Sequence, residues 1–134
     1  MIYSPGVPVF RDDQDCLLDN FFKTSVVTAP AINMGVINSR ESENIEHALK
    51  VMAERIRKFL ILCANEGEKN LILGAWGCGV FQNDPEWIAR TFVRALKSDE
   101  FGGLFSKVIF AIPNSGRTGE ENFEAFKKVL AKEK

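Results

Sequence analysis

The chain has 134 residues, the usual size of one domain, and its 46% hydrophobic and 26% charged residues are typical of a globular protein. Its 17 basic and 18 acidic residues leave a net charge of −1, which excludes the basic surplus of a nucleic-acid-binding protein. No apolar run is long enough to span a membrane, and no signal-like segment follows Met1. We therefore expect a single domain over residues 1–134, a cytoplasmic location, and neither a membrane nor a nucleic-acid partner.

The first 33 residues predict extended structure. Pro5 and Pro8 are typical of an edge strand or a loop, with VPVF as a short extended piece. A β-branched segment, residues 24–28, ends at Pro30 and predicts a strand.

A helix is predicted from Asn38, where the spacing of apolar residues becomes helical. Asn38 and Glu41 resemble a capping box, and Gly67 is a typical helix stop. The apolar stripe consists of Ile45, Leu49, Met52, Ile56, Phe59, Leu60 and Cys63.

The second half of the chain predicts two further strand–helix pairs. The apolar run LILGAW, residues 71–76, is typical of a strand covered on both faces. Asp84 and Pro85 predict the start of a helix that ends before residues 101–103. Residues 108–112 predict another strand, and Thr118 with Glu121 predicts a capping box at the start of the last helix. The inner faces of the two helices would carry Ile88, Phe92, Ala95 and Leu96, and Phe123, Phe126 and Leu130.

Strands and helices thus alternate from residue 24 onward. This order predicts an α/β fold with a largely parallel sheet and helices on both faces, a three-layer α/β/α sandwich.

The glycine-rich turn Gly77–Phe81 lies at the carboxyl end of a predicted strand, where ligands bind in open α/β sheets. Glycine permits a close backbone approach, and successive N–H groups in such a turn can hold an anion. The start of the next helix would add a field that favours negative charge. These features indicate a phosphate or diphosphate site. A merely tight strand–helix turn is the alternative, because Gln82 replaces the third glycine of GxGxxG and no GK[ST] motif is present.

The cysteines indicate neither a metal site nor a nucleophile. Cys16, Cys63 and Cys78 have no metal-ligand spacing, and the chain has a single histidine, His47. We therefore expect reduced thiols, no metal and no cofactor. Cys78 has no neighbouring histidine to activate it, so a small side chain packed in the turn is the favoured interpretation.

Four segments, in chain order, resemble the microbial-type poly(ADP-ribose) glycohydrolases, a branch of the macrodomain superfamily. They are YSPGVPVFRDD (3–13), VVTAPAIN (26–33), LILGAWGCGVFQNDP (71–85) and VIFAIPN with NFEAF (108–126). The resemblance covers nearly the whole chain, and residues 71–85 are its most specific part. It implies a macrodomain fold with ADP-ribose, an ADP-ribosyl chain or a related nucleotide as the ligand.

The resemblance also implies site residues. Gly77, Cys78, Gly79 and Val80 would offer backbone N–H groups to the diphosphate, and Phe81 would pack against the ribose or adenine. Further candidates would line the same crevice or its adenosine end: Ala29, Pro30, Asn33, Asn114 and Asn122. The alternatives are that Asn33 and Asn114 only form turns and that Phe81 belongs to the core.

The family's catalytic motif is missing from the chain. In the family, a glycine run and a Gln-Glu-Glu triplet that supplies the acid/base lie upstream of the YSPxVxxFR segment. Neither is present, and Glu120-Glu121 occupies a different place in the order. We therefore expect ADP-ribose binding without the catalytic acid, and no catalytic residue is assigned. The chain would be a short binding homologue, a fragment or product of a misplaced start codon, or one half of a site completed by another chain.

Two alternatives to simple binding stay open at this point. The chain could be an ADP-ribosyl glycohydrolase that uses Asp12 or Asp13, or a partner chain, in place of the missing acid. It could also be a non-catalytic remnant whose role is assembly. Because relatives carry N-terminal elements that pack on the sheet, we expect an uncovered apolar surface, and a homodimer or another oligomer that buries it.

Overall fold

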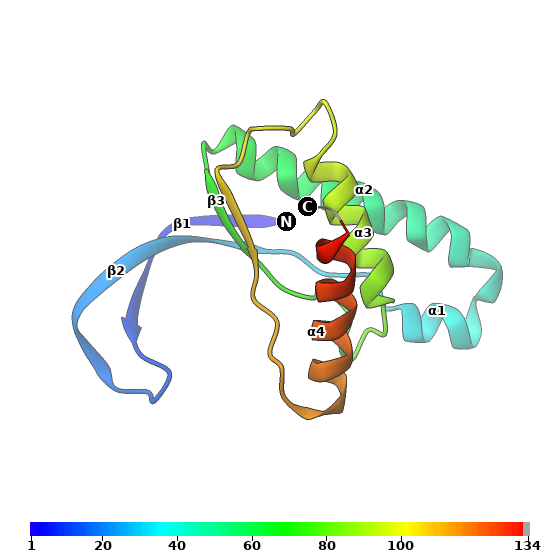
Figure 1. Cartoon of the computed structure of the whole chain (residues 1–134), viewed down its shortest axis with the longest axis horizontal. Helices are drawn as coiled ribbons and strands as arrows, with labels where there is room; N and C mark the ends of the chain where they lie inside the picture. Colours follow the sequence, from blue (N-terminus) through cyan, green and yellow to red (C-terminus); the bar gives the residue numbers. More distant parts are fainter. Residues whose placement is uncertain (133–134) are drawn as a thin grey trace. The chain divides into compact units, whose positions relative to one another are not determined.

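The structure, a computed structural model, describes residues 1–132 and divides into two compact units, Met1–Pro30 and Ala31–Lys134. The first unit contains β1 (Ile2–Arg11) and β2 (Leu17–Thr28). The second contains α1 (Met34–Arg40), a short 3-10 helix (Ser42–Asn44), α2 (Ile45–Asn65), β3 (Asn70–Leu73), α3 (Pro85–Leu96), β4 (Lys107–Phe110) and α4 (Gly116–Ala131) (Figure 1). Helices and strands alternate through the second unit, and the α/β class is confirmed.

The first unit is an antiparallel hairpin in which Tyr3 lies opposite Val27 and Val9 opposite Phe22. Its turn is organised by Asp12, whose Oδ1 accepts hydrogen bonds from the backbone N–H groups of Gln14 and Cys16, both at 2.9 Å. The prediction that residues 24–28 join a largely parallel sheet was therefore wrong. The reason is the short turn, which returns the chain beside β1 and permits only antiparallel pairing.

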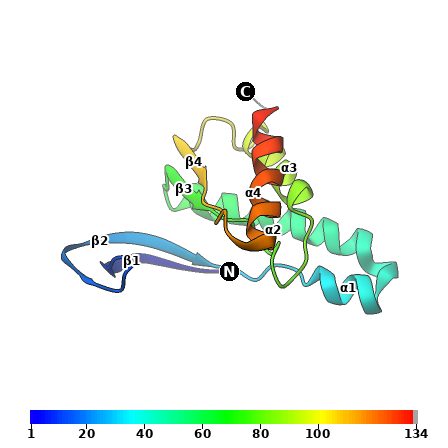
Figure 2. The same cartoon turned by 60° about the horizontal axis from the view of Figure 1, so that its bottom comes forward.

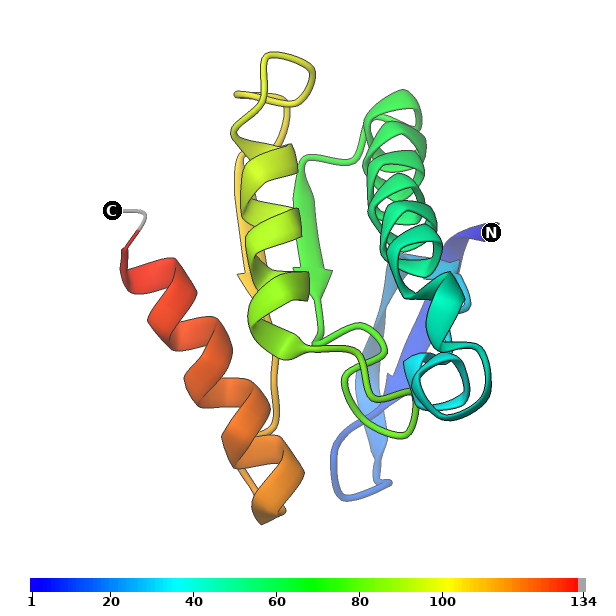
Figure 3. The same cartoon turned by 90° about the vertical axis from the view of Figure 1, so that its right-hand side faces the viewer.

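The second unit is built on β3 and β4, which pair in parallel with Leu71 opposite Val108 and Leu73 opposite Phe110 (Figure 2). Helix α3 follows β3 and precedes β4 in the chain, and it lies along the two strands on one face of the pair (Figure 3). Leu71 and Leu73 are buried, whereas Ile72 is 78% exposed. Because side chains alternate along a strand, this pattern is that of a strand covered on one face. The expectation that residues 71–76 are covered on both faces was wrong.

An aromatic series runs through the core of the second unit. Ring centroids are 6.1 Å apart between Phe59 and Trp76, 6.4 Å between Trp76 and Phe92, 5.6 Å between Phe92 and Phe110, and 5.2 Å between Phe110 and Phe126. The series links α2, β4, α3 and α4 to the start of the loop after β3, and so gives that loop a packed base.

Of the predicted helix ends, two are confirmed. Asp84 caps α3, accepting hydrogen bonds from the N–H groups of Glu86 (2.8 Å) and Trp87 (3.3 Å), and Gly67 follows the end of α2 with φ +77°. No helix in the described part of the chain has the length and apolar character that crossing a membrane requires.

The other two predicted starts were wrong. Asn38 lies inside α1, which begins after Asn33, and Thr118 lies inside α4, which begins at Gly116. Asn33 offers the same capping chemistry as Asn38 five residues earlier: its side chain accepts from the N–H of Val36 at 3.2 Å.

Candidate phosphate-binding loop

The segment from Gly74 to Asn83, called here the glycine loop, leads from β3 to α3. It is folded by its own backbone: Trp76 N–H donates to Gly74 O at 2.9 Å, and Gln82 N–H donates to Gly79 O at 2.9 Å. Asn83 N–H donates to Gly77 O at 3.0 Å and closes the loop around the two glycines. These hydrogen bonds hold the backbone of the loop in a series of tight turns.

Several amides of this loop have no partner. Within residues 1–132, no hydrogen bond has the backbone N–H of Gly77, Gly79, Val80 or Phe81 as its donor. A backbone N–H that is not hydrogen-bonded within the protein is free to bind water or a ligand. Because these donors lie close together along the chain, the loop can offer several N–H groups to one anion without using a charged side chain.

Cys78 differs from its neighbours. Its N–H donates to Ala75 O at 3.0 Å, so this amide is occupied in the present conformation, in contrast to its expected role as an open donor. Its side chain is buried, and burial, with a smaller contribution from the negative charge of Asp84, raises the pKa of the thiol to about 12. A thiol that stays protonated near neutral pH is a poor nucleophile. The side chain of Cys78 fills space beneath the turn.

Asn83 is a site residue that the sequence interpretation missed. It is 3% exposed, and its Nδ2 donates to Ile32 O at 2.8 Å and to Gly77 O at 3.0 Å. Asn83 therefore ties the segment before α1 to the glycine loop. Its Oδ1 is buried without a hydrogen-bond partner among the described residues. The sequence signal was weak, because Asn83 precedes the capping Asp84 and resembles an ordinary turn residue.

The start of α1 is attached to the same loop. The carbonyl oxygen of Phe81 accepts hydrogen bonds from the N–H groups of Met34 at 2.8 Å and Gly35 at 3.2 Å. Gln82, with φ +54°, turns the backbone directly after this contact. Two segments distant in sequence, residues 31–35 and the glycine loop, thus form one continuous structure.

Of the predicted loop residues, the structure places Gly79, Val80 and Phe81 at the surface, whereas Cys78 is buried. Val80 is 89% exposed and Phe81 is 37% exposed, so the ring of Phe81 is not part of the core. Asn33 lies beside the loop at the start of α1, where its side chain caps that helix. Ala29 and Pro30 end the first unit.

The two remaining candidates, Asn114 and Asn122, lie after β4 and within α4. Asn114 is exposed on the segment that leaves β4; this segment begins beside β3, where Ala111 N–H donates to Leu73 O at 2.7 Å. Asn122 is half-buried within α4. Among the described residues, no hydrogen bond joins either asparagine to the glycine loop.

The start of α3 does not add to the anion site as expected. The N–H groups of Glu86 and Trp87 already bind the carboxylate of Asp84, which also places a negative charge at this helix end. An anion would therefore be held by the loop amides rather than by the helix terminus.

The chain was compared with known proteins. Neither a protein-family model nor a curated protein sequence matches it. Solved structures do: poly(ADP-ribose) glycohydrolase (PARG) from Deinococcus radiodurans in complex with ADP-ribose is 39% identical, with a TM-score of 0.89, over 98% of this chain and 52% of that one. The apo form of the same enzyme is 40% identical, with a TM-score of 0.86, over 97% of this chain and 52% of that one.

A PARG from a second organism gives the same result. The enzyme from Thermomonospora curvata is 38% identical, with a TM-score of 0.85, over 95% of this chain and 46% of that one. The chain spans about half the length of the PARG structures that it matches. It is therefore a PARG-like chain, similar in sequence and in fold to one half of these bacterial enzymes.

Proposed function

We propose that this chain binds ADP-ribose and that the glycine loop holds the diphosphate of the ligand through backbone amides. The observation that carries this proposal is the set of amides without internal partners at Gly77, Gly79, Val80 and Phe81. The similarity to D. radiodurans PARG in complex with ADP-ribose supports the identity of the ligand.

The exposed ring of Phe81 would pack against the ribose or adenine, as aromatic side chains commonly do with nucleotides. Its backbone is fixed by the two hydrogen bonds to the start of α1, so the ring is attached to a rigid base. Asn33, beside the loop at the start of α1, and Asn114, on the segment that leaves β4, are retained as candidates for contacts at the adenosine end.

We propose binding rather than hydrolysis by this chain itself. The alternative needs a replacement carboxylate, and Asp12 and Asp13 are the candidates. Asp12 organises the hairpin turn through its two accepted hydrogen bonds, which supports a structural role. Asp13 is exposed in the same turn. Cleavage of ADP-ribosyl bonds by a larger assembly that contains the remaining half of a PARG is a separate proposal.

Isothermal titration calorimetry with ADP-ribose tests the binding proposal. The unmodified chain should bind, and Gly79→Trp should weaken binding by at least about tenfold, because the indole would occupy the ligand's position and block several charge-assisted hydrogen bonds. Val80→Ala is the matched control: it removes an 89% exposed side chain but keeps the amide, so affinity should change less than about twofold.

The Gly79→Trp variant should affect ligand binding without affecting folding. A Cβ at Gly79 would meet no atom within 4 Å, and Gly79 does not have a positive φ, so Gly79→Trp should fold as the unmodified chain does. Circular dichroism checks this point. No heat from the unmodified chain at millimolar ADP-ribose would refute the proposal, as would unchanged affinity in a folded Gly79→Trp variant.

Two broader proposals accompany this function. The uncovered face of the β3–β4 pair, with Ile72 78% and Ile109 42% exposed, supports a homodimer or another oligomer. The unpaired state of Cys16, Cys63 and Cys78 supports a reducing compartment such as the cytoplasm.

A further inference from the structure

An open cleft of about 360 Å³ lies between α2, the length of α3 and the segment that follows α3, and none of the residues that line it belongs to the glycine loop. Helix α2 contributes Arg57, and α3 contributes Trp87, Arg90 and Arg94. The three α3 residues are separated by three and four positions and therefore share one face of the helix. The cleft thus combines three guanidinium groups with the ring of Trp87, and the buried Phe101 also lines it.

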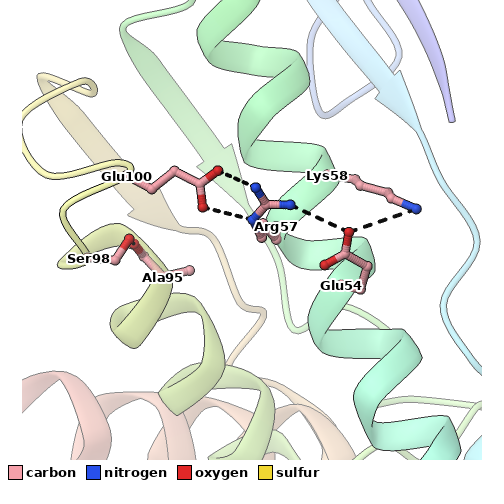
Figure 4. Close-up of polar contacts among 6 residues, drawn as sticks. All are labelled: Glu54, Arg57, Lys58, Ala95, Ser98 and Glu100. Atoms are coloured by element: carbon pink, nitrogen blue, oxygen red, sulfur yellow. Dashed lines mark hydrogen bonds and ion pairs between the residues drawn. The ribbon is translucent and has the colours of Figure 1, made fainter.

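The three arginines differ in their partners. Arg57 forms a two-point ion pair with Glu100, from Nε at 2.8 Å and Nη2 at 2.6 Å (Figure 4). Arg90 pairs with Glu86 at 3.1 Å, and Glu86 also binds Lys128. Arg94 has no ion pair or hydrogen bond through its side chain in the part of the chain that the structure describes. The charge of Arg94 is therefore uncompensated.

The other polar groups do not compete for an anion. Ser98 donates its hydroxyl hydrogen to Ala95 O at 2.7 Å, and Thr91 donates its own to Trp87 O at 2.8 Å. Glu100 lines the cleft, but both oxygens of its carboxylate accept hydrogen bonds from the guanidinium group of Arg57. Glu54 lies beyond Arg57 and next to Lys58 (Figure 4). Arg94 consequently has its whole guanidinium group available, whereas Arg90 has one nitrogen, Nη2, engaged by Glu86 and its other N–H groups available. The lining arginines outnumber Glu100, so the cleft carries a positive surplus.

We propose that this cleft is a second anion site, which binds a phosphate or diphosphate group through Arg94 and Arg90. Guanidinium groups match the geometry of phosphate oxygens with paired donors. Trp87 offers a flat surface on which a base or sugar attached to the phosphate can stack. The volume of the cleft is in the range of small-molecule sites, which leaves room for more than the phosphate itself.

The chain contains its own two reporters for the test. Of its two tryptophans, Trp76 lies at the start of the glycine loop and Trp87 lies in the cleft. Their indole N–H signals can be followed separately by ¹H–¹⁵N NMR, with a Trp87→Phe variant used only to assign the peaks. The full chain is titrated with inorganic pyrophosphate and, in a second arm, with ADP.

The Trp87 signal should shift saturably with both probes. Arg94→Gln should weaken this response by about tenfold, the effect of losing one charge-assisted contact. Arg117→Gln is the matched control: it removes the same charge from α4, at a 92% exposed side chain, and should change the response less than about twofold. Tighter binding of ADP than of pyrophosphate would support stacking on Trp87, and equal binding would support recognition of phosphate alone.

Three outcomes would overturn the second site. The first is no saturable shift of Trp87 at millimolar probe. The second is equal weakening by Arg94→Gln and Arg117→Gln, which would indicate general charge attraction. The third is a shift of Trp76 alone, which would support the glycine loop as the binding site while excluding the cleft. A shift of Trp87 without Trp76 would support the cleft independently of the proposed function.

Discussion

Gly77 and Gly79 are two residues apart in the glycine loop, and the structure requires glycine at only one of them. Gly77 has φ +78°, and a Cβ there would lie 2.6 Å from Ala31 Cβ and 2.6 Å from Asn83 Nδ2. Gly79 has neither constraint. Gly77 therefore allows the close approach of the loop to residues 31–33, whereas Gly79 keeps the surface above the free amides open.

This contrast gives a prediction for stability. Gly77→Ala should lower the free energy of unfolding by about 2–3 kcal/mol, because it combines an unfavourable φ with steric overlap. Gly79→Ala should change it by less than about 0.5 kcal/mol. Urea unfolding of both variants measures the difference. Equal effects of the two substitutions would contradict the assignment of separate roles.

At the scale of elements, α3 and α4 are joined by a shared acidic side chain. Glu86, in the first turn of α3, binds Lys128 of α4 and Arg90 of its own helix. The hydrogen bond from Lys128, followed by that from Arg90, lowers the pKa of Glu86 below its ordinary value of 4.5. Because the folded pKa is lowered, the contribution to stability is present above pH 4.5 and is lost as the pH falls through the folded pKa.

Lys128→Met should raise the pKa of Glu86 toward its ordinary value, since it removes the largest cause of the shift. A carboxyl ¹³C NMR titration of Glu86 measures this. Lys127→Met is the control, because Lys127 pairs with Glu124 and not with Glu86, and it should leave the titration of Glu86 unchanged. The same pKa in both variants would show that Lys128 does not act on Glu86 in solution.

At the scale of the whole molecule, the buried core belongs to the second unit. Every buried hydrophobic side chain of the described residues lies between Met34 and Val129. The hairpin exposes large apolar side chains, including Leu17, Phe21 and Phe22 at 69%, 60% and 58%. A two-stranded hairpin without buried side chains has little stability of its own. Together with the uncovered face of the β3–β4 pair, the hairpin gives both units exposed apolar surface.

Self-association is therefore predicted. Multi-angle light scattering at micromolar concentration should give a mass above the 15.0 kDa of one chain. Ile72→Lys should shift the equilibrium toward the monomer, because burying a charge on this face is costly. Val80→Lys places the same charge on the glycine loop and should leave association unchanged. A stable monomer of the unmodified chain would refute the prediction, and an unchanged oligomer in Ile72→Lys would refute the role of this face.

The sequence alone determined the α/β class, the order of the elements from α2 onward, the start of α3 at Asp84–Pro85 and the position of the glycine loop. It did not show that the helix expected from Asn38 is divided into α1, a 3-10 helix and α2. These features are local: helical spacing, a capping side chain and a glycine pair act within a few residues of the chain. For the same reason the resemblance to PARG could be read from short segments. The starts expected at Asn38 and Thr118 were wrong, because a residue able to cap a helix can equally lie inside one.

Only the tertiary structure decided how these pieces meet. The antiparallel pairing of β2 with β1 and the one-sided covering of β3 depend on which surfaces come together, and a strand's own residues do not specify this. The occupied amide of Cys78, the two carbonyl contacts of Asn83 and the attachment of α1 to Phe81 likewise join residues across turns or across distant segments. Neither the turn hydrogen bonds that occupy some loop amides nor the bonds between distant segments leave a periodic pattern in the sequence, so only the folded chain shows which amides stay free.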